Sequence, residues 1–239
     1  MDVWFFIAAL AAEVVGTMAG FGSSMILLPI ALLFFDFSTA LVLVSFMHLF
    51  GNIGRIIFFF RGVSWRTVVN FGVISVVGAI IGALFVRYID QELLKALLGL
   101  FLVGYGAFTL AEPGFRLRRT LPTMLIGGTT SGFLAGLIGT GGALRGAFLT
   151  AFKLPKVQYI STAAVIALVV DGARIPLYIK DGLMTGAYYW MLPILFVLAL
   201  AGSYIGRKLV VAIPQKLFQR LVLGCLILGG MKLVIDYLL

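Results

Sequence analysis

The sequence has few of the residues from which enzymes build metal centres, disulfide frameworks and nucleophilic sites. Among its 239 residues there is one cysteine, Cys225, and one histidine, His48, so no internal disulfide and no cysteine-histidine metal cluster can form. No Walker loop and no H-E-x-x-H motif occurs, and a Ser-His-Asp triad would depend on His48 alone. We therefore expect a protein that is not an enzyme and that holds no metal ion and no cofactor.

Charged residues are scarce as well. They make up 11% of the chain, hydrophobic residues make up 62%, and the mean hydropathy is +1.15. Because no soluble domain has a core that hides so much apolar surface, the composition predicts a polytopic membrane protein surrounded by the lipid bilayer. The formal net charge of +9 would suggest a nucleic-acid partner in a soluble protein. Here the cations flank apolar segments, so we attribute them to orientation in a membrane and expect no nucleic-acid partner.

Glycine, in contrast, is abundant, and it interrupts two long apolar runs. The first run covers residues 3–35 and is broken at Gly20-Phe21-Gly22-Ser23-Ser24; the second covers 121–152 and is broken at Gly139-Thr140-Gly141-Gly142. Half of either run is about 24 Å long as a helix, short of the roughly 30 Å of membrane hydrocarbon, so a run cannot cross twice. The breaks therefore predict two re-entrant hairpins of two half-helices each. The alternative is one over-long tilted helix, with glycines that only allow close helix packing.

The segments that follow each run repeat in the same order. After the first hairpin we expect spans at 38–60, 67–86 and 93–111, and after the second at 157–178, 187–209 and 217–238. The polar segment 112–120 would link the halves 1–111 and 121–239. Since each half then crosses the membrane three times, the two halves face in opposite directions. The sequence thus predicts an all-α membrane protein of two inverted repeats, each a broken re-entrant helical hairpin followed by three transmembrane helices.

Individual residues repeat between the halves as well. The matching positions include Gly22 with Gly141, Asn52 with Asp171, Arg55 with Arg174, Gly78 with Gly202, and Gly82 with Gly206. Matches at corresponding places in both halves indicate a duplicated unit.

The loop cations favour the same topology. With both runs re-entrant, one side of the membrane holds Arg61, Arg66, Arg116, Arg118, Arg119, Lys153, Lys156, Arg207, Lys208, Lys216 and Arg220. The other side keeps Arg87, Lys95, Lys180 and Lys232. Because cytoplasmic loops carry the excess of lysine and arginine, the first side is predicted to be cytoplasmic. Both termini would then lie on the extracytoplasmic side.

Taken together, several motifs resemble those of the sulfite exporter TauE/SafE family, also called the toluene sulfonate uptake permeases. The motifs are the two glycine breaks, Pro29 after the first of them, the polar-plus-arginine motif in the next span, and the G-x-x-x-G spans that close each half. The resemblance covers nearly the whole chain. It implies a transporter in the bacterial or archaeal cytoplasmic (inner) membrane that carries sulfur-containing anions such as sulfite, sulfoacetate or other organosulfonates. The sequence departs from the family pattern at Gly22-Ser23-Ser24, which replaces a longer glycine run.

The hairpin breaks suit an anion without any appeal to the family. The second half-helix of each hairpin would begin at mid-membrane, with free N–H groups and the positive end of its dipole. Ser23 and Ser24 begin one such half-helix, and Gly141 and Gly142 begin the other. The glycines at the breaks, which include Gly22, allow an anion to approach the backbone closely, and the serines add hydroxyl donors.

Arg145 is the first candidate for a charged substrate-binding residue. It lies one turn beyond the second break, and an arginine at membrane depth costs several kcal/mol unless it is paired or hydrated. Its planar guanidinium matches a pair of sulfite or sulfonate oxygens. The alternative is a structural ion pair with Glu13 or Asp171.

A polar helix face adds further candidates. His48, Asn52 and Arg55 are spaced i, i+4 and i+7, and Asp171 and Arg174 take the corresponding places in the second half. We expect His48 and Asn52 to contribute to substrate binding. Arg55 and Arg174 either guide or gate anions at the two mouths or extend to the membrane interfaces.

Three residues are candidates for proton coupling. Glu13, Asp171 or His48 would gain a proton when the anion binds. The alternatives are that Asp171 and Arg174 neutralise each other and that His48 is a neutral packing residue.

The sequence therefore predicts a secondary transporter of small anions that works by alternating access around two opposed hairpins. A passive anion channel would share this architecture. A membrane scaffold or enzyme subunit without a solute path is the third possibility. Nothing in the sequence indicates an oligomeric state.

Overall fold

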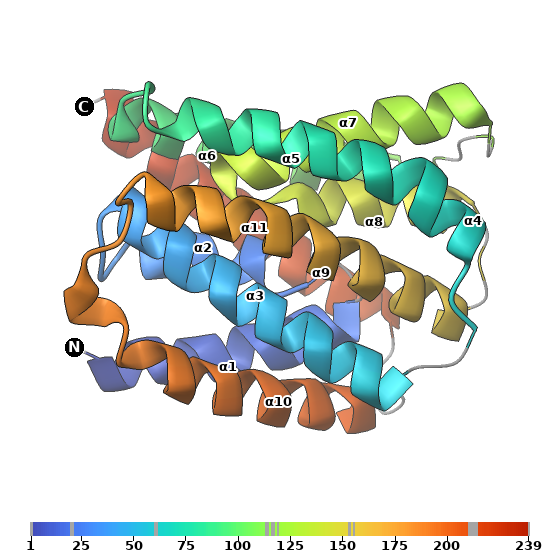
Figure 1. Ribbon diagram of the computed structural model, residues 1–239, viewed down its shortest axis with the longest axis horizontal. Coiled ribbons are helices and arrows are strands. Elements are labelled where there is room, and N and C mark those ends of the chain that lie inside the picture. Colours follow the sequence, from blue (N-terminus) through green and yellow to red (C-terminus); the bar gives the residue numbers. More distant parts are fainter. Residues whose placement is uncertain are drawn as a thin grey trace.

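The computed structural model describes residues 2–19, 22–59, 62–112, 115, 118, 120–152, 154, 156–209 and 215–238. Its regular secondary structure within these residues is entirely helical, and the helices lie side by side along the long axis of one bundle (Figure 1). Six of the described helices are long and apolar enough to cross a membrane. The all-α polytopic membrane protein predicted from the composition is therefore confirmed.

The helices of the first half are α1 (Asp2–Ala19), α2 (Ser24–Ala31), α3 (Phe37–Phe59), α4 (Trp65–Thr67), α5 (Val73–Val86) and α6 (Gln91–Ala111). A π-helical segment, η1 (Val68–Gly72), joins α4 to α5 without a loop. The second half contains α7 (Leu121–Ile138), α8 (Gly141–Ala151), α9 (Lys156–Lys180), the 3₁₀ turn η2 (Gly186–Tyr188), α10 (Met191–Leu209) and α11 (Gln215–Leu238).

Each of the two long apolar runs is a pair of helices separated by a break. A glycine in the left-handed region lies in each break, Gly22 with φ +97° and Gly139 with φ +72°. Residues with a Cβ atom rarely adopt this backbone conformation, which explains why glycine occupies both positions. The first part of the first break, Gly20-Phe21, lies outside the described residues.

The arms of the two hairpins are unequal, whereas the sequence suggested even halves. The first arms, α1 and α7, have 18 residues each, but α2 has 8 and α8 has 11. At 1.5 Å per residue α7 is about 27 Å long, which is why it counts among the six helices of membrane-spanning length. The left-handed glycines also align the breaks differently: Gly22 corresponds to Gly139, and Ser23 therefore corresponds to Thr140.

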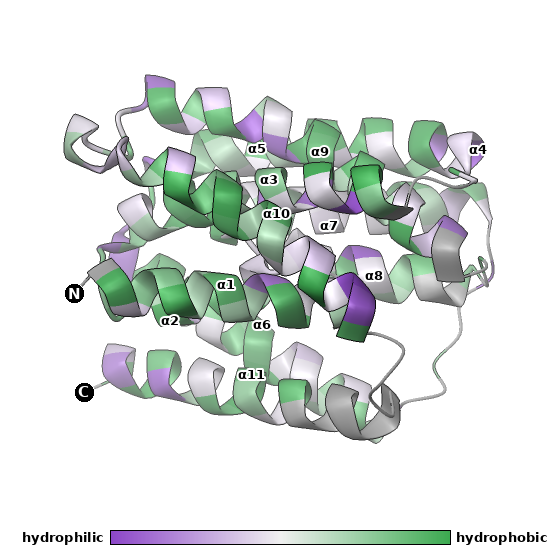
Figure 2. Ribbon diagram, turned by 90° about the horizontal axis from the view of Figure 1, so that it is seen from below, coloured by the Kyte–Doolittle hydropathy of each residue, from purple (hydrophilic) through white to green (hydrophobic). Residues whose placement is uncertain are grey.

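The two hairpins enter the bundle from opposite ends. In Figure 1, α1 and α3 run away from the end where the chain starts, and α7 and α9 run toward it. The labels N and C lie at the same end of the long axis in Figures 1 and 2. The loop after α5 and the loop after α9 lie next to each other, because Arg87 in the first pairs with Asp181 in the second at 3.3 Å.

Small residues allow the closest helix contacts. Cβ atoms built on Gly78 and Gly82 of α5 would collide with the backbone of α7. On α10, a Cβ on Gly202 would lie 2.9 Å from the Glu13 side chain, and one on Gly206 would lie 2.8 Å from the Val14 carbonyl oxygen of α1. These glycines are therefore packing residues, as in other membrane helix pairs.

The outside of the bundle is apolar, as lipid contact requires. Figure 2 shows hydrophobic residues along most of the helices. Large apolar side chains are strongly exposed on different helices, for example Trp4, Leu100, Val197 and Leu228. Such a surface is stable in lipid but not in water.

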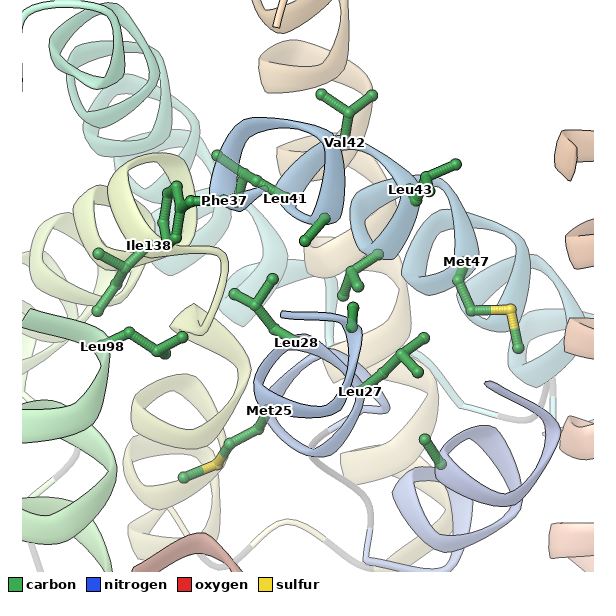
Figure 3. Close-up of a cluster of buried hydrophobic side chains, with 14 of the residues drawn as sticks. Met25, Leu27, Leu28, Phe37, Leu41, Val42, Leu43, Met47, Leu98 and Ile138 are labelled. Atoms are coloured by element: carbon green, nitrogen blue, oxygen red, sulfur yellow. The ribbon is translucent and has the colours of Figure 1, made fainter. Parts of the chain in front are cut away.

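The short helix α2 is fixed by a buried apolar cluster. Figure 3 shows Leu27 and Leu28 of α2 beside Leu41 of α3, with Leu98 of α6 and Ile138 of α7 close by. A Cβ built on Gly139 would lie 3.0 Å from the Leu28 side chain, so α2 contacts the break of the other hairpin. The two hairpins therefore meet inside the bundle.

Candidate functional site

The break of the first hairpin lies against the middle of α3. His48 is the twelfth of the 23 residues of α3, and a Cβ built on Gly22 would collide with its Nε2 atom. Ser23 caps α2 but makes no side-chain capping hydrogen bond. Both the Ser23 Oγ and the His48 Nε2 are buried and have no hydrogen-bond partner among the residues that the structure describes. Ser24, the first residue of α2, is buried beside them.

The break of the second hairpin leaves a matching buried hydroxyl. Thr140 is fully buried, and its Oγ1 also lacks a hydrogen-bond partner within the described part of the chain. Gly141 and Gly142 follow as the first turn of α8 and are buried. A Cβ on Gly141 would collide with the Ser131 carbonyl oxygen of α7, so the return of the chain at this point requires glycine.

Arg145 lies on the next turn of α8 and is only 4% exposed. It makes no hydrogen bond and no ion pair with any described residue, although its charge interacts with Asp171, Tyr159, Arg174 and Arg55. The predicted alternative, an ion pair with Glu13 or Asp171, is therefore not formed in this structure.

His48 and Asp171 join α3 to α9. The His48 Nδ1 lies 2.7 Å from the Asp171 Oδ2, and the Asn52 amide donates to the same oxygen at 3.4 Å. Because an ionised carboxylate only accepts hydrogen bonds, the His48 Nδ1 carries the proton of this contact. The other oxygen, Oδ1, accepts from the Arg174 Nε at 3.0 Å and lies 2.8 Å from its NH2.

Arg174 also holds the second hairpin. It donates to the Ala135 carbonyl oxygen in the last turn of α7, and the hydroxyl of Tyr178 donates to the carbonyl oxygen of Gly136. Both carbonyls lie in the last turn of α7, where the Ala135 oxygen also accepts from the backbone N–H of Gly139 at 3.1 Å. Asp171 and Arg174 thus form an ion pair, and the arginine in addition clamps α7 to α9.

Arg55 holds the first hairpin in the same way. Its NH2 lies 2.6 Å from the Glu13 Oε1, and its Nε donates to the Thr17 hydroxyl at 3.1 Å, both on α1. The Ser203 hydroxyl of α10 donates to the same Glu13 oxygen at 2.9 Å. A Cβ on Gly51 would collide with the Glu13 carboxylate, so glycine makes room for the pair. The Glu13 Oε2 has no partner in the described residues.

Asn52 connects the two ion pairs. Its carbonyl oxygen accepts from Arg55 at 2.6 Å, and its amide donates to Asp171. We use the name polar centre for the connected side chains of Glu13, Thr17, His48, Asn52, Arg55, Asp171, Arg174, Tyr178 and Ser203. Arg55 and Arg174 are 4% and 1% exposed, so neither extends to a membrane interface.

Four buried polar residues at the site were not expected from the sequence: Thr17, Thr140, Tyr178 and Ser203. Thr17 and Tyr178 each lie one helical turn after a predicted site residue, and Thr140 lies inside a predicted break, so spacing alone was a usable signal. Ser203 lies between two packing positions of α10 and gave no signal.

All residues of the polar centre are buried in this conformation, and so are Ser23 and Thr140 at the two breaks. One cavity of about 360 Å³ is lined by Arg66, Asn70, Leu121 and Met124, and another of about 530 Å³ lies between α2, α6 and α11. Neither is lined by a residue of the polar centre. The described residues contain no group of three or more His, Cys, Asp or Glu side chains arranged to hold a metal ion.

Comparisons with known proteins cover almost the whole chain. A family model described as Sulfite exporter TauE/SafE matches residues 5–233. One relative, named as a probable membrane transporter protein of Methanocaldococcus jannaschii, is 28% identical over 230 residues, which are 85% of this chain and 83% of the relative. No solved structure matches the chain. The family match includes both hairpins and every residue of the polar centre.

Proposed function

We propose that this chain, which belongs to the sulfite exporter TauE/SafE family of membrane transporters, is a secondary transporter of small sulfur-containing anions. Its substrate would be sulfite, sulfoacetate or another organosulfonate, moved across the inner membrane of a prokaryotic cell by alternating access. The binding site would lie between the two hairpin breaks, beside the polar centre.

One observation carries this proposal: the hydroxyls of Ser23 and Thr140 are buried at the two breaks, and neither they nor the buried Arg145 has a hydrogen-bond or ion-pair partner among the described residues. Leaving a buried hydroxyl unpaired costs about 1–3 kcal/mol, and an unpaired buried charge costs more. The oxygens of a sulfonate or sulfite would satisfy Ser23, Thr140 and Arg145 together. Both hydroxyls precede the first turn of a helix, where free N–H groups favour an anion.

Alternating access follows from a division of the chain into two inverted repeats, 1–111 and 121–239, linked by 112–120. The packing supports this division: α5 contacts α7 as α10 contacts α1, α2 contacts α3 as α8 contacts α9, and α6 contacts α11. The corresponding helices run in opposite directions in Figure 1. Each half would then contribute one re-entrant hairpin, and both termini would be extracytoplasmic.

Arg55 and Arg174 each hold one hairpin in place, and the hairpins are the parts that would move during transport. Arg55 binds the first arm of one hairpin, α1, and Arg174 binds the first arm of the other, α7. Since the site is closed, an anion enters only when one hairpin moves away from the α3–α9 pair. Gating by Arg55 and Arg174 would consist of keeping one hairpin clamped while the other opens.

Uptake into proteoliposomes tests the proposal. We expect the purified protein to take up labelled sulfite or sulfoacetate with saturable kinetics and counterflow, which distinguish a carrier from a passive channel. Arg145→Ala should remove most of this uptake, whereas Arg118→Ala, a matched change at an exposed arginine, should not. No uptake above protein-free liposomes would contradict the proposed function, and unchanged uptake by Arg145→Ala would remove Arg145 from the site.

A further inference from the structure

We infer that His48 binds the anion in its protonated form, so that one anion and one proton occupy the site together. This inference rests on the proposed function, because it assigns the coupling ion of the same site. The step is a proton transfer from a hydronium ion to the His48 Nε2, which converts the neutral imidazole into an imidazolium ion. One O–H bond of the hydronium ion breaks, one N–H bond forms, and a water molecule is left.

The geometry of His48 leaves one nitrogen available. Its Nδ1 is held by Asp171 at 2.7 Å, and its Nε2 is buried, has no partner in the described residues and points at the first break. A neutral ring with the proton on Nδ1 has a lone pair on Nε2, which repels an anion. Only after protonation does Nε2 donate a hydrogen bond to the anion. An anion at this break therefore requires the imidazolium form.

The charges around His48 make binding of the anion and of the proton mutually favourable. Asp171 of α9 stabilises an imidazolium, although Arg174 already neutralises part of its charge. On α3 itself Arg55 is paired with Glu13 of α1, and α2 carries no charged residue. Arg55 and Arg145 of α8 both oppose protonation of His48, and Arg145 has no ion-pair partner among the described residues. An anion on Arg145 removes its share of this opposition, and by linkage a protonated His48 strengthens anion binding by the same factor.

Gly22 gives the proton and the anion a common route. The backbone of the first break covers the His48 Nε2 so closely that a side chain at Gly22 would collide with it. Water reaches Nε2 only when this break moves away, which is also the movement that admits the anion. The anion and the proton would therefore bind from one side of the membrane and be released together on the other. The anion would then be carried in the direction in which the proton gradient drives protons.

The single histidine of the chain allows a direct test without any substitution. We would label the purified protein with ¹⁵N-histidine and record the two ring nitrogen resonances at pH 7.5, with and without sulfoacetate. We expect a neutral ring, with two widely separated shifts, in the absence of the anion. On binding, the shifts should converge as both nitrogens become protonated, with uptake of about one proton per bound anion.

Two variants assign the proton. His48→Gln keeps a hydrogen-bond donor near the Nε2 position but cannot be protonated, so its bound sulfoacetate should take up no proton. Glu13→Gln removes the buried carboxylate whose Oε2 has no partner in the described residues, and the ratio of protons to anions should stay near one. A histidine that stays neutral when sulfoacetate binds, or proton uptake lost in Glu13→Gln but kept in His48→Gln, would overturn the inference alone. Failure of the wild-type protein to bind any anion would overturn the proposed function as well.

Discussion

The two hairpins share an architecture but differ in charge. In the first, the Glu13 carboxylate of α1 is paired with Arg55, and no charged residue follows on α2. In the second, α7 and α8 carry no acidic residue, and their one charge, Arg145, has no ion-pair partner among the described residues. The buried charge of the first hairpin is thus neutralised by an arginine of α3, whereas no ion pair neutralises the buried charge of the second.

This difference separates structural roles from binding roles. A paired buried charge contributes to stability only while its partner is present, whereas an unpaired one reduces stability until a ligand arrives. Glu13 and Arg55 would therefore matter first for folding, and Arg145 first for transport. Substitutions in each hairpin test the comparison, because they should affect stability in the first hairpin and transport in the second.

The largest effect is expected for Glu13→Ala. The substitution leaves Arg55 buried without its counterion, which should lower the free energy of unfolding by about 3–5 kcal/mol. Thermal unfolding in one detergent measures the loss. The double variant Glu13→Gln with Arg55→Met removes both charges and should lose less than Glu13→Ala does. If Glu13→Ala is as stable as the wild type, the pair does not clamp α1.

Arg145→Ala should give the opposite pattern. Loss of a charge-assisted contact of about 1.5–3 kcal/mol should weaken the apparent anion affinity about 10- to 150-fold. Stability should not fall, since no described residue loses an ion pair. Uptake kinetics measure the apparent anion affinity, and thermal unfolding of the same preparation measures the stability. A variant that unfolds readily but transports normally would reverse the roles assigned to the two hairpins.

The two left-handed glycines sharpen the comparison between the breaks. Gly22→Ala and Gly139→Ala should each cost about 1–3 kcal/mol of stability through backbone strain. Transport should suffer more in Gly22→Ala, because its new Cβ meets the ring of His48, whereas that of Gly139→Ala meets the flexible side chain of Leu41 at 2.8 Å. Equal losses of transport would mean that the first break does not act through His48.

The smallest effects are expected at the two unpartnered hydroxyls. Ser23→Ala and Thr140→Val should each weaken anion affinity about 2- to 10-fold, in line with a net 0.5–1.5 kcal/mol per neutral hydrogen bond. Neither should lower stability, because each removes a buried polar atom that lacks a partner in the described residues. Anion affinity measured by competition in the uptake assay checks this. Similar losses from both variants would place the anion between the hairpins, and a loss from only one would place it at that break.

Much of the fold could be predicted because its signals are local. The length and hydropathy of apolar runs mark helices, and the glycines at two places mark the breaks. The relative lengths of the arms could not be predicted, because each break contains several glycines and only packing decides which one becomes left-handed. In the second break it is Gly139, two residues before the Gly141 that the repeat suggested.

The candidate site was predictable only within single helices. The spacing of His48, Asn52 and Arg55 places them on one face, and Asp171 with Arg174 on another. That Arg55 pairs with Glu13, and that Ser203 joins them, depends on contacts between α1, α3 and α10 that spacing does not contain. From charge alone, Arg145 could equally have been the ion-pair partner of Glu13 or of Asp171.

An experimental structure with a bound organosulfonate tests the central claim most directly. The account predicts that the sulfonate oxygens lie within hydrogen-bond distance of the Ser23 and Thr140 hydroxyls and of the Arg145 guanidinium. A sulfonate bound in the cavity lined by Arg66 and Asn70, with both breaks closed and empty, would contradict it.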